Sequence, residues 1–187
     1  YVHYNTGLHI SENGRKFSDL LETITAQSRK PMALFIVAHS MGGLVSRSAC
    51  HYGKESGHTW VKHLRKLIFL GTPHHGSPLE KGGNWIDTIL EISPYSAPFS
   101  RLGKIRSRGI TDLRYGNVVE DDWKECDRFD FRGDPRTPVP LPESVQCYSI
   151  AATTGKESNG LGDRLMGDGL VTLNSALGRH KNAELNL

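Results

Sequence analysis

The feature of this chain with the clearest chemical content is Ser40, which stands at the end of an apolar run. Residues 35–38 read FIVA, and the positions two before and two after the serine, Ala38 and Gly42, are small. A buried strand that turns sharply into a helix needs small residues there, because bulky side chains would collide across the turn. Such a turn exposes the serine hydroxyl at its apex. We therefore expect Ser40 to be a catalytic nucleophile in ester chemistry.

The usual form of this turn is G-x-S-x-G, and here Ala38 replaces the first glycine. Alanine still fits sterically. The alternative interpretation is an ordinary turn between a strand and a helix with a serine on the surface. The apolar run before Ser40 favours the nucleophile, as do the small residues that follow it, namely Gly43, Ser46, Ser48 and Ala49.

A serine hydroxyl needs a histidine to accept its proton and a carboxylate to orient that histidine. With this type of turn the three residues follow in the order serine, carboxylate, histidine. Asp168, within GDGLV at residues 167–171, fits the carboxylate, although a plain Asp-Gly turn would look the same. His180 is the only histidine after it, and no strand is evident before His180. The base is therefore expected to be either His180 or a histidine beyond Leu187.

The remaining site residues are expected around the serine. An oxyanion hole needs two N–H groups, and one should come from Met41 at the N-terminus of the helix after the nucleophile. His39 would point away from the substrate pocket or pack beside it. His74 and His75 follow a strand end and could line the pocket, as could Trp85. A loop shaped by the neighbouring proline and glycine is the alternative for these two histidines.

Strand-like and helix-like segments alternate along the chain. Strands are predicted at residues 1–5, 33–38, 64–70 and 145–152, and helices are predicted from a cap at Ser11 onward and at 42–52. The continuous apolar run at 33–38 is typical of a strand buried on both faces. One apolar face of the first helix is predicted from the spacing of Phe17, Leu20, Leu21 and Ile24. The alternation predicts an α/β fold with a parallel sheet and catalytic positions at the carboxyl ends of its strands.

A long insertion, residues 77–143, separates two of these strands within the single domain formed by residues 1–187. It holds seven of the nine prolines and two of the three tryptophans. We interpret it as a cap or lid over Ser40, since loops of this length in a compact domain are usually functional. Its first part is apolar and includes Trp85, Ile86, Ile89 and Leu90. Its solvated outer face is predicted to carry a basic block and then an acidic block of Glu120, Asp121, Asp122, Glu125, Asp127, Asp130 and Asp134.

Composition bounds the function. The chain of 187 residues is long enough for one domain with its own core. Its 23 basic and 20 acidic residues give a net charge of +3, which favours neither a nucleic acid nor an anionic membrane as partner. No apolar stretch approaches the length of a membrane span. We expect a small-molecule ester or lipid substrate, no nucleic-acid partner and no integral membrane segment, while the oligomeric state stays open.

The three cysteines are far apart and odd in number, so they predict neither a disulfide framework nor a metal site. We expect no cofactor and no metal. Cys50 and Cys147 are predicted to be small buried hydrophobic residues. Reduced thiols slightly favour the cytoplasm, and secretion stays open because the chain begins at Tyr1, already inside a strand-like run.

Three motifs occur in a fixed order along the chain: AHSMGGLV at residues 38–45, GTPHHGSP at 71–78 and GDGLV at 167–171. They resemble the bacterial lipase/esterase branch of the α/β-hydrolase superfamily, in particular its triacylglycerol-lipase-like and GPI-inositol-deacylase-like members. The similarity runs over nearly the whole chain and includes residues 4–14, YNTGLHISENG.

The resemblance implies an α/β-hydrolase core with Ser40 as nucleophile, Asp168 as the acid and the Met41 N–H as an oxyanion donor. The histidine of the family usually follows in an Asn-His-Leu or Gly-His context, which does not occur after Asp168. The family's His-Gly oxyanion loop is also absent upstream of Ser40. The resemblance therefore implies a core piece of an esterase that lacks its first strands and its last strand and helix.

The function expected from the sequence is a serine carboxylic-ester hydrolase that acts through an acyl-enzyme on Ser40. Two alternatives stay open. A thioesterase, acyltransferase or amidase would share the fold and the turn around the serine. A noncatalytic hydrolase-like module could instead bind a partner or a lipid through the apolar face of residues 85–92.

Overall fold

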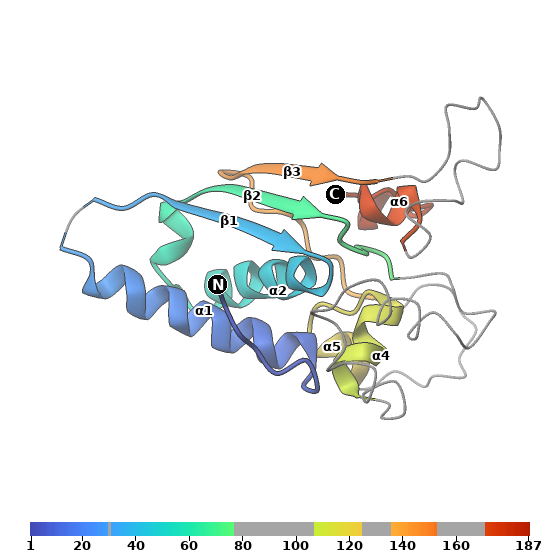
Figure 1. Ribbon diagram of the computed structural model, residues 1–187, viewed down its shortest axis with the longest axis horizontal. Helices are drawn as coiled ribbons and strands as arrows, with labels where there is room; N and C mark the ends of the chain where they lie inside the picture. The colour runs from blue at the N-terminus through green and yellow to red at the C-terminus, as the bar shows by residue number, and fades with distance from the viewer. Residues whose placement is uncertain (30, 77–106, 125–135, 153–170) are drawn as a thin grey trace.

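The computed structural model describes residues 1–29, 31–76, 107–124, 136–152 and 171–187 (Figure 1). In these ranges the elements are, in chain order, α1 (Ile10–Gln27), β1 (Leu34–His39), α2 (Met41–Glu55), the 3-10 helix η1 (Trp60–His63), β2 (Leu64–Leu70), α4 (Arg108–Tyr115), α5 (Asp121–Lys124), β3 (Gln146–Ile150), α6 (Leu173–Ala176) and the 3-10 helix η4 (Ala183–Leu185). The predicted bounds of β2 are confirmed, and α2 runs three residues beyond its predicted end at residue 52.

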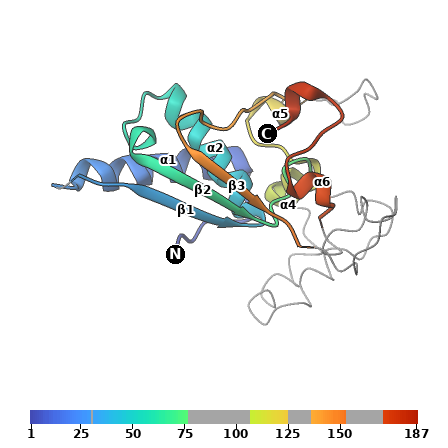
Figure 2. The same ribbon diagram turned by 90° about the horizontal axis from the view of Figure 1, so that it is seen from above.

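The three strands form a parallel sheet in the order β1-β2-β3. Parallel neighbours need a crossover connection, and α2 supplies it between β1 and β2. Figures 1 and 2 show α1 and α2 side by side against one face of the sheet. The predicted α/β fold with a parallel sheet is confirmed.

The two faces of the sheet differ in burial. The inward rows are Ile36, Leu67 and Cys147, then Ala38, Phe69 and Ser149, and they face the two helices. The outward rows are Phe35, Lys66 and Gln146, then Val37, Ile68 and Tyr148, then His39, Leu70 and Ile150. We call these nine residues the outer sheet face.

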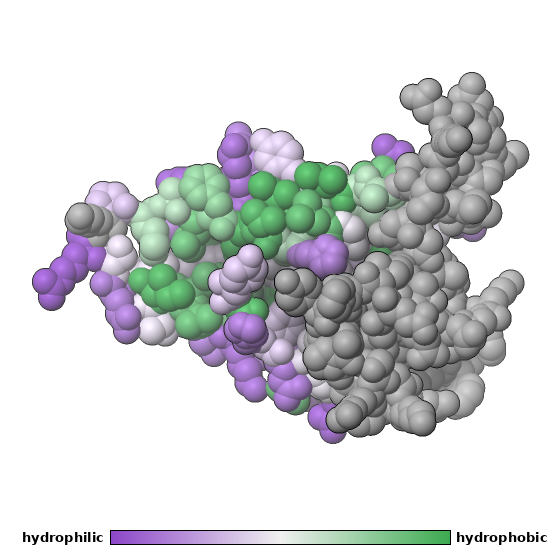
Figure 3. All heavy atoms as spheres, in the orientation of Figure 1, coloured by the Kyte–Doolittle hydropathy of each residue, from purple (hydrophilic) through white to green (hydrophobic). Residues whose placement is uncertain are grey.

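The prediction that the first apolar run is buried on both faces is wrong. Phe35 is 59% exposed and Val37 is 64% exposed, whereas Ala38 on the opposite side of β1 is buried. Figure 3 shows hydrophobic residues gathered over the strands on this side. The cause is that α1 and α2 cover only the inward rows.

The face of α1 that meets α2 is built from small residues. Gly14 lies so close to Ser48 that a Cβ on Gly14 would collide with that side chain. This close approach turns the rest of α1 relative to the predicted apolar face. Leu21 is buried, but Leu20 and Ile24 are 43% and 44% exposed, so the prediction is wrong for these two residues.

The start of α1 also differs from the prediction. Residues 1–5 do not form a strand. They pair with no described strand, so β1 stands at one edge of the described sheet. The helix begins at Ile10 with His9 as its N-cap, and not at a cap formed by Ser11. The Asp112 carboxylate accepts hydrogen bonds from Ile10 N at 2.8 Å and from His9 Nδ1 at 3.0 Å. An acceptor from α4 therefore supplies the cap that the prediction assigned to a local hydroxyl.

The described parts of the 77–143 segment contribute to the core. Four of their residues, Leu113, Val118, Val119 and Val139, pack in one cluster with Ile10, Met41, Leu44, Val45 and Tyr52 of the two main helices. Residues 77–106 and 125–135, on which most of the cap interpretation rests, lie outside the described residues. The interpretation of residues 77–143 as a cap stays a prediction.

Asp122 corrects the expected solvated acidic face. This residue is buried, and its carboxylate accepts hydrogen bonds from the backbone N–H groups of Val118, Val119 and Thr137. A buried carboxylate is tolerated where several donors bind it. Here the Asp122 carboxylate fastens two loop segments to α5, one at Val118 and Val119 and the other at Thr137. In the described part of the chain, no helix has both the length and the apolar character that crossing a bilayer requires.

Candidate active site

Ser40 sits at the single-residue junction between β1 and α2. Its backbone has φ 51° and ψ −125°, and it is the one residue other than glycine with positive φ among those described. Two hydrogen bonds hold this turn: Ser40 N donates to Leu70 O, and Gly43 N donates to Ser40 O, both at 3.0 Å. A side chain in this sparsely populated region costs about 1–3 kcal/mol and persists only where the surroundings enforce it. The serine is partly exposed at the carboxyl edge of the sheet.

The close approach next to the turn occurs at Gly43. A Cβ on Gly43 would collide with the side chain of Thr72, which is fully buried on the loop after β2. A Cβ on Gly42 would meet only the Tyr4 hydroxyl, at an ordinary contact distance of 3.8 Å. A small residue was expected at position 42, and the tightest approach lies one residue later, at Gly43.

The N-terminus of α2 presents hydrogen-bond donors beside the serine. The N–H groups of Met41 and Gly42 have no acceptor among the described residues, as is usual for the first turn of a helix. The helix dipole adds partial positive charge at the same end. The turn can therefore stabilise negative charge that develops next to Ser40.

The loop after β2 is fastened from two sides. Ser175 of α6 accepts hydrogen bonds from His75 N through its Oγ and from His74 N through its carbonyl. Its hydroxyl then donates to Gly76 O at 2.8 Å. From α2, Arg47 donates to His74 O at 3.4 Å. These contacts fix the backbone that carries the two histidines.

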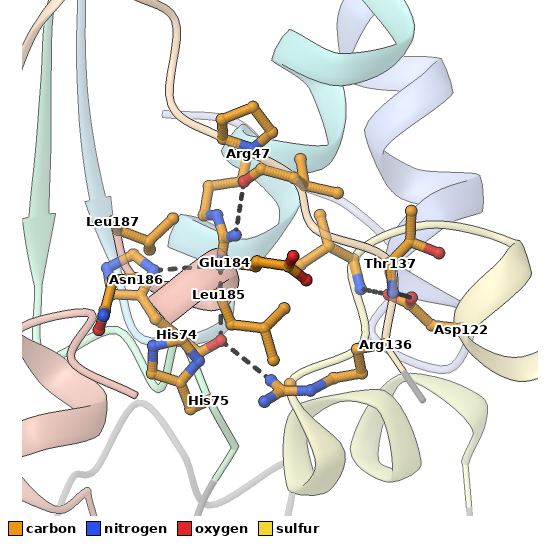
Figure 4. A pocket seen from close by; sticks show the side chains of 14 residues that line it. Arg47, His74, His75, Asp122, Arg136, Thr137, Glu184, Leu185, Asn186 and Leu187 are labelled. Atoms are coloured by element: carbon orange, nitrogen blue, oxygen red, sulfur yellow. Dashed lines mark hydrogen bonds between the residues drawn. The ribbon is translucent and has the colours of Figure 1, made fainter. Parts of the chain in front are cut away.

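His74 and His75 line a cavity of about 20 Å³ between α2, α5 and the C-terminal residues (Figure 4). Arg47 and Arg136 also line it, and both guanidinium groups approach His74 O. Ser40 is not among the lining residues. A cavity of this size holds about one water molecule, so in its present form it does not admit an acyl chain.

Burial keeps both histidines neutral near pH 7. Burial, together with the neighbouring Arg47 cation, lowers the pKa of His74 to about 2. Burial lowers the pKa of His75 to about 4 as well. Burial also lowers the pKa of Arg47 to about 10, which still leaves it protonated at neutral pH. A neutral His74 with Nδ1 beside the Arg47 donor carries its proton on Nε2, which is buried and has no hydrogen-bond partner among the described residues.

His180 follows α6 and turns toward the loop after β2. Its ring centroid lies 4.9 Å from that of His75. Its Nδ1 accepts a hydrogen bond from Asn182 N at 3.1 Å, so in the neutral ring the proton resides on Nε2. An imidazole in this tautomer cannot take a serine proton through Nε2. Within the described ranges, no hydrogen bond joins the Ser40 hydroxyl to an imidazole ring.

The other site residues predicted from the sequence are distributed as follows. His39 is exposed at the end of the outer sheet face and points away from α1 and α2. Asp168 and Trp85 lie outside the described residues. Sequence reasoning missed Arg47 and Tyr4. The signal for Arg47 was a cation on the face of α2 that is otherwise small and apolar, whereas no sequence signal pointed to Tyr4.

The sequence matches the family described as the PGAP1-like alpha/beta domain over residues 9–137. The chain belongs to this family. The PGAP1-like chain also resembles two crystal structures of the Bacillus licheniformis lipase BlEst2. The mature form is 21% identical with a TM-score of 0.52, covering 95% of this chain and 64% of that one. The propeptide form is 20% identical with a TM-score of 0.51, covering 96% of this chain and 37% of that one.

The likeness to BlEst2 concerns the fold alone, and together with the family match it confirms the fold class predicted from the motifs. The PGAP1-like chain spans less than two thirds of the length of the mature lipase. A comparison with curated proteins gave no match.

Proposed function

We propose that this PGAP1-like chain carries the nucleophile of a serine carboxylic-ester hydrolase of the lipase/esterase type. The observation that carries the proposal is the positive φ of Ser40 at the junction of β1 and α2. Backbone strain of this kind clusters at active sites, because it aims a reactive side chain that a relaxed turn would not present. The family match and the likeness to a protein named as a lipase support the same reaction class.

In the proposed reaction, the Ser40 hydroxyl attacks the carbonyl carbon of an ester while a histidine takes its proton. The carbonyl π electrons move onto the oxygen, and the Met41 N–H donates a hydrogen bond to that oxyanion. The intermediate collapses to an acyl-enzyme and releases the alcohol, which receives the proton from the histidine. Water then attacks the acyl-enzyme by the same route and releases the acid.

The histidine that acts as the base and the carboxylate that orients it are part of the same proposal. Asp168 is the candidate to orient the histidine. His180 can serve as the base only after its ring exchanges the hydrogen bond with Asn182 N, which frees the proton to reside on Nδ1.

A fluorophosphonate probe tests the nucleophile directly. It forms a covalent bond with an activated serine, and intact-protein mass spectrometry followed by peptide mapping locates the adduct. We expect one adduct on Ser40 in the unmodified chain and none in Ser40→Ala. The matched control is Ser56→Ala, because Ser56 is exposed at the other end of the same helix. An unlabelled chain, or an adduct that persists in Ser40→Ala, would contradict the proposal.

A further inference from the structure

Tyr4 brings a hydroxyl to the first turn of α2. Its ring is partly buried and packs against the cluster that contains Met41, Leu44 and Ile10. Its hydroxyl oxygen lies 3.8 Å from the position that a Cβ on Gly42 would occupy. The segment before α1 therefore crosses the helix that begins at the proposed nucleophile.

The direction of this contact places the hydroxyl at the N-terminal end of α2. In an α-helix every Cα–Cβ bond tilts toward the helix N-terminus. The Tyr4 hydroxyl oxygen therefore lies beside the first turn of α2, close to where a side chain at the second residue of the helix would project. The two N–H groups without acceptors, those of Met41 and Gly42, point toward the same end.

The hydroxyl of Tyr4 has no hydrogen-bond partner within the described parts of the chain. The Tyr52 hydroxyl of α2, by contrast, accepts a hydrogen bond from Glu120 N at 2.9 Å. Burial raises the pKa of the Tyr4 phenol, so it stays protonated and can donate throughout the neutral range. Phenylalanine would fill the same space against Met41, so packing alone does not account for the hydroxyl.

We propose that the Tyr4 hydroxyl is a second donor of the oxyanion hole and works beside the Met41 N–H. This inference rests on the proposed role of Ser40 as nucleophile. When the Ser40 oxygen bonds to the ester carbon, the carbonyl π pair moves to the oxygen, and Tyr4 donates a hydrogen bond to it without transferring its proton. The substrate class is a carboxylic ester.

The test compares Tyr4→Phe with the unmodified chain in the rate of labelling by a fluorophosphonate, whose phosphoryl oxygen occupies an oxyanion hole. Tyr115→Phe is the control, because Tyr115 is an exposed tyrosine of α4. We expect Tyr4→Phe to label about 100- to 1,000-fold more slowly, since the loss of one oxyanion donor costs roughly this much. The maximal rate should fall while the probe concentration at half-saturation stays the same. Tyr115→Phe should label at the unmodified rate.

The outcomes separate this inference from the proposed function. Labelling of Tyr4→Phe at the unmodified rate overturns the role of Tyr4 and leaves the nucleophile in place. A chain that is not labelled at Ser40 overturns the proposed function and this inference with it. Rates are compared at a temperature where circular dichroism shows each variant fully folded, so that a loss of stability does not imitate a loss of chemistry.

Discussion

At the scale of single residues, Ser40 combines a proposed chemical role with a conformational cost. Its φ of 51° lies in a region that glycine adopts readily and that other residues avoid. The turn is held by the hydrogen bond from Ser40 N to Leu70 O and by the first turn of α2. The molecule therefore retains a strained residue at the position where the hydroxyl is presented.

This strain predicts a difference between two substitutions that both remove the hydroxyl. Ser40→Gly relieves the backbone strain, whereas Ser40→Ala keeps it. We expect the glycine variant to have a free energy of unfolding about 1 kcal/mol higher than the alanine variant, measured by urea denaturation. Glycine also makes the unfolded chain more flexible, and this effect alone would lower the free energy of unfolding of the glycine variant. An alanine variant that is as stable as the glycine variant would show that the strain is no larger than this entropic contribution, against the expectation.

At the scale of elements, the loop after β2 is the part that depends on distant segments. Arg47 of α2 and Ser175 of α6 both fasten it, and their packing buries His74 and partly buries His75. His74 is 1% exposed. The histidines are therefore neutral in the folded protein over a pH range in which the unfolded chain protonates them.

This burial predicts a loss of stability in acid. Folding lowers the pKa of His75 from 6.5 to about 4 and that of His74 to about 2. Between about pH 6.5 and 4 the unfolded chain therefore binds more protons than the folded protein, and stability falls as the pH falls. The expected slope is about 1.4 kcal/mol per pH unit for each histidine. Urea midpoints between pH 7 and 5 measure it.

The variant His75→Gln isolates one of these groups and should reduce the loss between pH 7 and 5. His3→Gln, at an exposed histidine of the N-terminal segment, is the control and should keep the full loss. Asp112 acts in the opposite direction, because burial raises its pKa and its contribution to stability is lost as the pH rises. If His75→Gln and the unmodified chain lose the same stability, His75 is not the group responsible.

The elements themselves were largely predictable from the sequence, because their signals are local. Continuous apolar runs located the strands, and the small residues around Ser40 located the turn. The prediction failed where a distant residue decided the outcome. Asp112 supplies the cap of α1 from more than 100 residues away, and Gly14 against Ser48 decides which face of α1 is buried. The contact between Tyr4 and α2 is of the same kind, so the sequence pattern does not reveal it.

At the scale of the whole molecule, the described helices α1 and α2 cover one face of the sheet. Parallel sheets occur almost only with both faces covered. In this structure the outer sheet face leaves four large apolar side chains between 46% and 64% exposed, those of Phe35, Val37, Tyr148 and Ile150. A contiguous apolar patch of this kind is unusual on a monomer surface.

This patch predicts binding of a hydrophobic dye such as anilinonaphthalene sulfonate by the folded chain. Val37→Thr keeps the branched shape that suits a strand and adds a hydroxyl to the exposed apolar row of β1, so we expect dye fluorescence to fall. Leu20→Gln, at an exposed leucine of α1 away from the sheet, should leave it nearly unchanged. Equal fluorescence from all three proteins would show that the dye does not report this face.

The contact of Ser175 with the loop after β2 also constrains the order of events during synthesis. The residues it joins, His75 and Gly76, are about 100 positions earlier in the chain. A ribosome adding about 5–20 residues per second releases the loop several seconds before its fastening partner. During that interval β1, α2 and β2 can pair and pack through contacts nearby in sequence. The backbone N–H groups of His74 and His75 have no hydrogen bonds to Ser175 until α6 has been synthesised. The conformation of this loop is therefore fixed later than the pairing of β1 with β2.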